Sequence, residues 1–214
     1  MITFWIVGLM LVGFEDNTTD RPAVEFQQML TNARAHPEQA DWHALRLAFA
    51  RTQDYQWGTP PVDFEPILQE VKNGERAAAL VAVDRLMSGR WVNPEAHFYA
   101  ALACHQLGEN NRRDLHLAFG RGLRAAMTQA GDGHSFQTAY QILFRDEEAY
   151  LLRWRFDREP TQCDRVKMTH DGRHYEVQSL RQDSGTEVQI YFDVELLWNR
   201  ENQTTKNAEK PDKP

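Results

Sequence analysis

The apolar residues of this 214-residue chain change their spacing at the turn Gly131-Asp132-Gly133. Before the turn they recur every three or four positions, which is typical of the buried side of an α-helix. After it Val188, Ile190 and Phe192 alternate with polar residues, which is typical of a strand with one buried face. The sequence therefore predicts an α+β fold, in which an N-terminal helical bundle is followed by a C-terminal antiparallel β-meander packed on helices.

Six helices are expected before the turn. Proline, aspartate and asparagine stand at several of their starts and glycine follows several of their ends, as helix termini favour. Small residues such as Ala96, Ala101 and Gly108 make the segment 75–127 resemble a tetratricopeptide-type hairpin. Because the sequence has no second repeat of comparable quality, we expect a single local hairpin and not an array of repeats. The expected helices are 23–33, 42–49, 63–72, 75–87, 94–107 and 111–130.

The remainder of the chain is expected to contain a short strand at 140–144, a helix at 146–154 and three further strands. Gly172 and Gly185 lie in turn sequences, so these strands should be consecutive neighbours in the sheet. Residues 199–214 are almost without apolar side chains and are expected to form a disordered tail, which leaves 23–198 as a single α+β domain. The three strands are expected at 165–169, 174–180 and 186–194.

The composition favours some partners over others. The formal net charge is −7 at pH 7, and lysines and arginines are interleaved with acids, which argues against a nucleic-acid partner. A hydrophobic fraction of 42% is enough for a packed core without a metal or a disulfide, so no cofactor is expected.

The first fourteen residues carry no charged side chain and are rich in apolar ones. This length matches the core of an export signal and is too short for a stable membrane span, which needs about 20 apolar residues. We expect residues 1–22 to be an export signal and linker and the protein to be periplasmic or envelope-associated. The alternative is a cytoplasmic protein in which this segment is a buried first element.

Cys104 and Cys163 are the two cysteines of the chain, which excludes a zinc site made of four thiolates. Cys104 lies within an apolar helical segment and is expected to be buried. The sequence leaves open whether the two cysteines pair.

One polar cluster lies around the turn at 131–133 and the helix start at 146. A carboxylate close to a histidine could bind a metal or act in acid–base catalysis, and His134 with Ser135 could form a nucleophile pair. No metalloprotease, nucleophile-elbow or calcium-loop spacing accompanies these residues, which favours roles in the turn and the helix cap. The cluster consists of Asp132, His134, Ser135, Asp146, Glu147 and Glu148.

A second cluster combines aromatic and charged residues at 42–57. Aromatic residues and arginine dominate the binding energy of many protein interfaces, so this cluster is a candidate binding surface. The alternative is that Trp42 and Tyr55 anchor their helix in the core. The cluster consists of Trp42, Arg46, Arg51, Asp54, Tyr55 and Trp57.

Five short runs stand at 39–55, 131–135, 138–140, 146–150 and 191–193. Their order and spacing resemble an uncharacterised bacterial family, the domain of unknown function numbered four-nine-one-nine. The resemblance covers about residues 40–197. In one departure, Ala149 separates Glu148 from Tyr150, where the family pattern has no intervening residue. The resemblance implies a fold and an export tendency, and it implies no activity.

The function expected from these observations is a non-catalytic protein-interaction module of the bacterial cell envelope, whose partner is another protein. Its oligomeric state is left open. The alternative is a hydrolase or metal-dependent enzyme that uses the region from Asp132 to Glu148.

Overall fold

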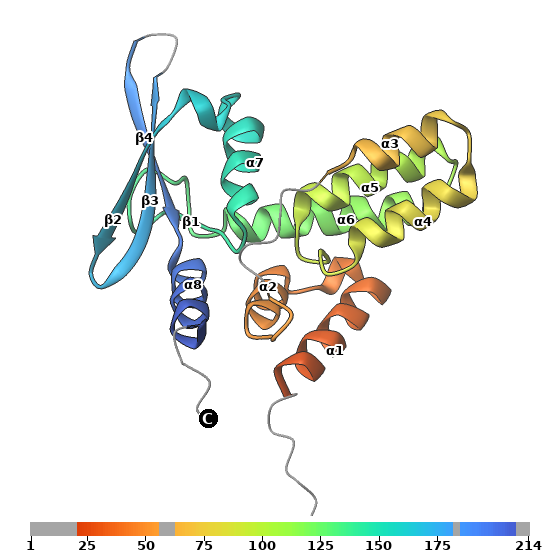
Figure 1. Ribbon diagram of the computed structural model, residues 1–214, viewed down its shortest axis with the longest axis horizontal. Coiled ribbons are helices and arrows are strands. Elements are labelled where there is room, and N and C mark those ends of the chain that lie inside the picture. Colours follow the sequence, from red (N-terminus) through yellow and green to blue (C-terminus); the bar gives the residue numbers. More distant parts are fainter. Residues whose placement is uncertain (1–20, 56–62, 182–184, 209–214) are drawn as a thin grey trace, which may run out of the picture.

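The computed structural model describes residues 21–55, 63–181 and 185–208, without the side chains of 203–208. Most of the helices come first and all of the strands lie in the C-terminal part of these residues, which confirms the expected α+β class (Figure 1). The helices are α1 (Arg21–Ala35), α2 (Trp42–Ala50), α3 (Glu65–Lys72), α4 (Arg76–Met87), α5 (Pro94–Gln106), α6 (Asn110–Met127), α7 (Arg145–Phe156) and α8 (Glu195–Ala208). The strands are β1 (Tyr140–Gln141), β2 (Asp164–His170), β3 (Arg173–Arg181) and β4 (Glu187–Asp193).

The first six helices pack in successive pairs, α1 against α2, α3 against α4 and α5 against α6 (Figure 1). The caps expected from the sequence are present. The Asp41 carboxylate accepts a hydrogen bond from Ala44 N at 2.9 Å, and the Asn93 side chain accepts one from Ala96 N at 3.0 Å. These bonds satisfy backbone N–H groups that the first turns of α2 and α5 would otherwise leave unpaired.

Two glycines on α6 let aromatic rings lie directly on its backbone. A Cβ atom on Gly120 would lie 3.1 Å from the ring of Phe98 on α5, and one on Gly122 would overlap the ring of Trp42 on α2. The hairpin of α5 and α6 is therefore closely packed, and α2 is held on its outer side.

The sheet has the strand order β1-β4-β3-β2. Strands β2, β3 and β4 are antiparallel neighbours, which confirms the expected meander, and β1 adds to β4 in parallel. The strand expected at 140–144 ends at Gln141. Leu143 N and Phe144 N donate to the Glu147 carboxylate instead of a neighbouring strand, so the chain turns into α7 at this point.

The prediction of a disordered tail from residue 199 is wrong for 199–208, which continue α8. Trp198 stacks on His174 with ring centroids 4.3 Å apart. Arg200 donates to the carbonyl oxygens of Gln53 and Tyr55 at 3.1 and 3.2 Å. These contacts with residues far away in the sequence attach a helix that has little apolar surface of its own.

Two groups of buried side chains form the core. The larger joins α1, α2, α6, α7 and the sheet, and the smaller joins α3, α4 and α5. Trp91 packs against both groups and so connects them. Cys104 is buried in the smaller group, as expected, and neither Cys104 nor Cys163 forms a disulfide. None of the helices in the described ranges has both the length and the apolar composition needed to cross a bilayer.

Candidate functional site

The outer edge of the sheet exposes apolar side chains on strand β2. This strand is last in the sheet order and lies away from the helical pairs formed by α1 to α6 (Figure 1). All of its residues except His170 are exposed, including Val166 at 56% and Met168 at 43%. Large apolar side chains on an edge strand are unusual, because such an edge can pair with another chain.

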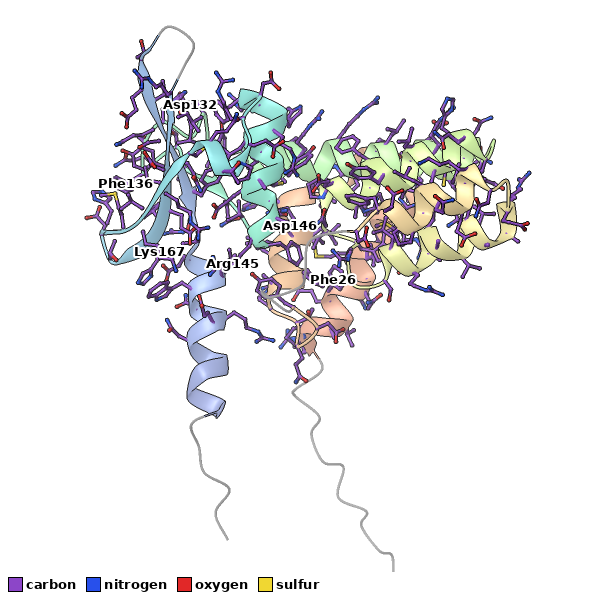
Figure 2. All side chains as sticks on the ribbon, turned by 45° about the horizontal axis from the view of Figure 1, so that its top comes forward. Phe26, Asp132, Phe136, Arg145, Asp146 and Lys167 are labelled. Atoms are coloured by element: carbon purple, nitrogen blue, oxygen red, sulfur yellow. The ribbon has the colours of Figure 1, made fainter. Side chains whose placement is uncertain are left out.

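Val166 and Met168 belong to an aromatic and apolar surface on one face of the sheet. They lie opposite Val177 and Tyr175 of β3. On the same face Phe136, from the loop that precedes β1, contacts Tyr175 and stacks on His170 with ring centroids 4.1 Å apart. Figure 2 shows Phe136 on the part of the sheet farthest from the helical pairs. We call this surface, made of Phe136, Val166, Met168, His170 and Tyr191, the outer sheet patch.

A pocket of about 410 Å³ continues the outer sheet patch toward the helices. Phe136 and Tyr175 form one side of it, and His43 of α2 and Gln141 of β1 form part of the other. The surface is thus hollowed at one end, where a side chain from a partner has room.

The opposite face of β2 carries two cations, Arg165 and Lys167, which are about half exposed. They share the buried Glu176 of β3, with Arg165 Nη1 3.1 Å from Glu176 Oε2 and Lys167 Nζ 4.0 Å from Glu176 Oε1. Arg145 of α7 lies 3.4 Å from the same carboxylate. Arg145 also lies 3.3 Å from Glu201 of α8, so three cations face two carboxylates and this edge is locally positive although the chain is acidic overall.

Glu148 of α7 lies beneath this edge and accepts a hydrogen bond from Gln178 Nε2 at 2.9 Å. Burial, and after it the neighbouring Glu176, raises the pKa of Glu148 to about 8. The raised pKa favours the protonated form of Glu148, as in a pair of carboxyl groups that share one proton.

The two clusters expected from the sequence are joined by one ion pair. Arg46 Nη1 and Nη2 donate to the two oxygens of Glu147 at 2.5 and 3.0 Å, and both side chains are about 1% exposed. Arg46 also donates to Gln141 O at 3.1 Å. The Glu147 carboxylate accepts from Leu143 N and Phe144 N, so the pair links α2, β1 and the start of α7.

Of the other residues of the 42–57 cluster, Tyr55 and Trp42 pack in the core, whereas Arg51 and Asp54 are exposed. Tyr55 is buried and donates to Leu143 O at 2.5 Å, and burial followed by the charge of Glu147 raises its pKa. Trp42 is partly buried and meets Phe119 edge-on at 4.8 Å. Because Arg46 and Tyr55 are buried, the interpretation of these two residues as an exposed binding surface is wrong. Trp57 lies outside the described residues.

Asp132 and His134 belong to a turn. Asp132 Oδ1 accepts from His134 N at 3.0 Å and from Thr138 Oγ1 at 2.8 Å, and these bonds hold its pKa below the usual value. Ser135 Oγ also contacts Thr138 Oγ1 rather than the imidazole of His134. Asx-type bonds of this kind are what fix a tight turn.

The expected convergence of this turn with the start of α7 is not found. Asp146 accepts a hydrogen bond from Asn93 at the start of α5 at 3.2 Å, and burial raises its pKa to about 6. Figure 2 shows Asp132 and Asp146 well apart, on different parts of the molecule. Over the described ranges there is no group of three or more histidine, cysteine, aspartate and glutamate side chains arranged to hold a metal ion.

The outer sheet patch and the cations beside it were not singled out from the sequence. The signal is present in the run from Asp164 to His170, where Arg165 and Lys167 alternate with Val166 and Met168. Charged residues, lysine in particular, are common on edge strands. The alternation by itself predicts a strand with one buried face, and the exposure of both faces of β2 follows from its place at the end of the strand order.

Comparisons with family models, curated proteins and solved structures found no match to this chain.

Proposed function

We propose that this protein is a non-catalytic protein-interaction module and that the outer sheet patch is its binding surface. The observation that carries the proposal is the exposure of Val166 and Met168 on an edge strand, beside Phe136 and Tyr191. Exposed apolar patches of this kind mark protein-binding surfaces, and aromatic residues supply much of the energy at such surfaces.

A photoreactive benzoylphenylalanine at position 168 should cross-link a specific protein in the native bacterial host. The matched control is the same residue at position 102, because Leu102 on α5 is exposed to the same extent as Met168. We expect one dominant adduct from position 168, identified by mass spectrometry, and none of that adduct from position 102.

The yield of this adduct should fall at least fivefold in Val166→Lys and stay unchanged in Val81→Lys. Val81 is 57% exposed on α4, which matches the 56% of Val166, so the two variants introduce the same charge at equally exposed sites. Two results would contradict the outer sheet patch as the binding surface. One is an equal yield of the adduct from positions 168 and 102, and the other is an effect of Val81→Lys as large as that of Val166→Lys.

We further propose that the module belongs to the bacterial cell envelope and to the family numbered four-nine-one-nine. The uncharged apolar residues 2–12 and the ordered runs from 39 to 193 support these two proposals.

Export makes a prediction that fractionation can check. Cell fractionation followed by N-terminal sequencing should find the protein outside the cytoplasm, with its first residue near Phe14 or with a tether there. A protein recovered in the cytoplasm with Met1 intact would contradict export and leave the interaction proposal standing.

A further inference from the structure

Strand β2 is seven residues long and stands at one end of the sheet that the described residues form. Within the described residues it pairs with β3 on one side, and the sheet order places no strand on the other. The backbone N–H and C=O groups on such an edge can pair with an extended segment of another chain, and side chains at alternate positions then decide which segment fits.

The side chains of β2 divide into two sets with different chemistry. Val166 and Met168 offer apolar contacts on the outer face, whereas Arg165 and Lys167 offer positive charge on the face toward α7. Glu176 is the carboxylate that both cations approach, and it also lies 3.4 Å from Arg145, which contacts Glu201 at 3.3 Å as well. The positive charge of this edge is therefore only partly neutralised.

Two registers in which a second copy of β2 could pair with this edge bring like charges together. Residues that lie directly opposite each other in an antiparallel pair share one face of the sheet. If two antiparallel copies of β2 pair with Lys167 at the centre, Lys167 of one copy lies opposite Lys167 of the other. If they pair with Val166 at the centre, Arg165 of one copy lies opposite Lys167 of the other. Like charges in directly opposite positions destabilise strand pairing, so these two registers are disfavoured for a pair of β2 strands.

We propose that β2 receives an extended segment of a partner protein as a fifth strand, with acidic residues beside Arg165 and Lys167 and apolar residues beside Val166 and Met168. This inference rests on the proposed function and adds to it the binding mode and the chemistry of the partner. Backbone hydrogen bonds supply affinity, the apolar residues bury the exposed side chains of β2, and the acidic residues select the segment.

Three synthetic seven-residue peptides test the inference on the full chain by fluorescence anisotropy at low salt. In the first, glutamate alternates with valine. In the second, lysine replaces glutamate, and the third is the first peptide with all of its backbone amides N-methylated. We expect the acidic peptide to bind at least tenfold more tightly than the basic one, and the N-methylated peptide to lose at least tenfold. Binding of the acidic peptide should weaken at 1 M salt, because salt screens exposed charges.

A charge reversal on the protein gives a result that a folding defect cannot mimic. Lys167→Glu should weaken binding of the acidic peptide and strengthen binding of the basic one. The matched control Lys72→Glu reverses a charge on α3, where Lys72 is also largely exposed, and should change neither affinity.

The outcomes separate this inference from the proposed function. Equal binding of the acidic and basic peptides, or full binding of the N-methylated one, overturns strand addition by an acidic segment. If position 168 still cross-links a host protein, the interaction module stands while this binding mode falls. A cross-linked dimer, or a cross-link to residues 2–12 of the same chain, assigns the edge to another occupant and also overturns the inference.

Discussion

Replacement of Glu147 by leucine should lower the free energy of unfolding by about 3–5 kcal/mol. The change leaves the guanidinium of Arg46 about 1% exposed and without its counter-ion. It also removes the acceptor of Leu143 N and Phe144 N. An uncompensated buried charge and unpaired backbone donors are among the most destabilising changes that one substitution can make. Urea unfolding, followed by circular dichroism, measures the loss.

Two controls separate the ion pair from the volume change. The double variant Arg46→Met with Glu147→Leu removes both charges and should recover part of the loss, because an apolar pair of similar size often replaces a buried ion pair without cost. Arg51→Met breaks the exposed pair with Glu25 and should cost at most about 1 kcal/mol. A loss in Glu147→Leu no larger than that in Arg51→Met would contradict a central role for the buried pair.

The elements that could be predicted were those whose signals are local. The apolar stripes of the helices, the caps Asp41 and Asn93 and the turns at Gly172 and Gly185 each act within a few residues, and the structure has helices, caps and turns at these places. The length of β1 and the helix α8 could not be predicted in the same way. β1 ends close to the point where Glu147 accepts from Leu143 N and Phe144 N, and α8 is attached through contacts of Trp198 and Arg200 with distant segments.

The candidate site also depends on contacts between distant parts of the sequence, which local patterns do not predict. Arg46 and Glu147 were noticed for their chemistry, but they are 101 positions apart, so nothing in the spacing of the sequence connects them as one buried pair. His97 and His116 likewise face each other across the hairpin of α5 and α6, with Nδ1 atoms 3.0 Å apart. The exposure of Val166 depends on the place of β2 in the strand order, which a sequence read one segment at a time does not give.

The second large effect is expected from Glu148→Gln, and its sign depends on pH. The pKa of Glu148 is raised from 4.5 to about 8 by burial and by Glu176. Below pH 4.5 the carboxyl is protonated in both the folded and the unfolded chain, so the raised pKa has no effect on stability. As the pH rises from about 4.5 to about 8, the unfolded chain loses this proton and the folded chain keeps it, so the wild-type protein is progressively destabilised.

The free energy of unfolding must be compared between variant and wild type at each pH, because other buried groups also change the stability over part of this pH range. Burial lowers the pKa of His97 to about 3 and that of His116 to about 4. Their contribution to stability is present above pH 6.5 and is lost as the pH falls below it, which is opposite in sign to the effect of Glu148. Both variant and wild type carry these histidines, so their contribution cancels in the difference.

Glu148→Gln should therefore be as stable as the wild type at pH 4.5 and more stable at pH 8. The expected difference at pH 8 is on the order of 3 kcal/mol, because each pKa unit corresponds to about 1.4 kcal/mol and the two carboxyl groups share the effect. The amide is neutral at every pH, can accept from Gln178 and can donate to Glu176, so it preserves the contacts of the protonated acid. Glu38→Gln, at an exposed position on the turn before α2, should show no such trend. Urea unfolding at steps between pH 4.5 and 8 measures the difference. If the difference stays constant over this range, or if the variant is the less stable protein at pH 8, the pKa of Glu148 is not raised by folding.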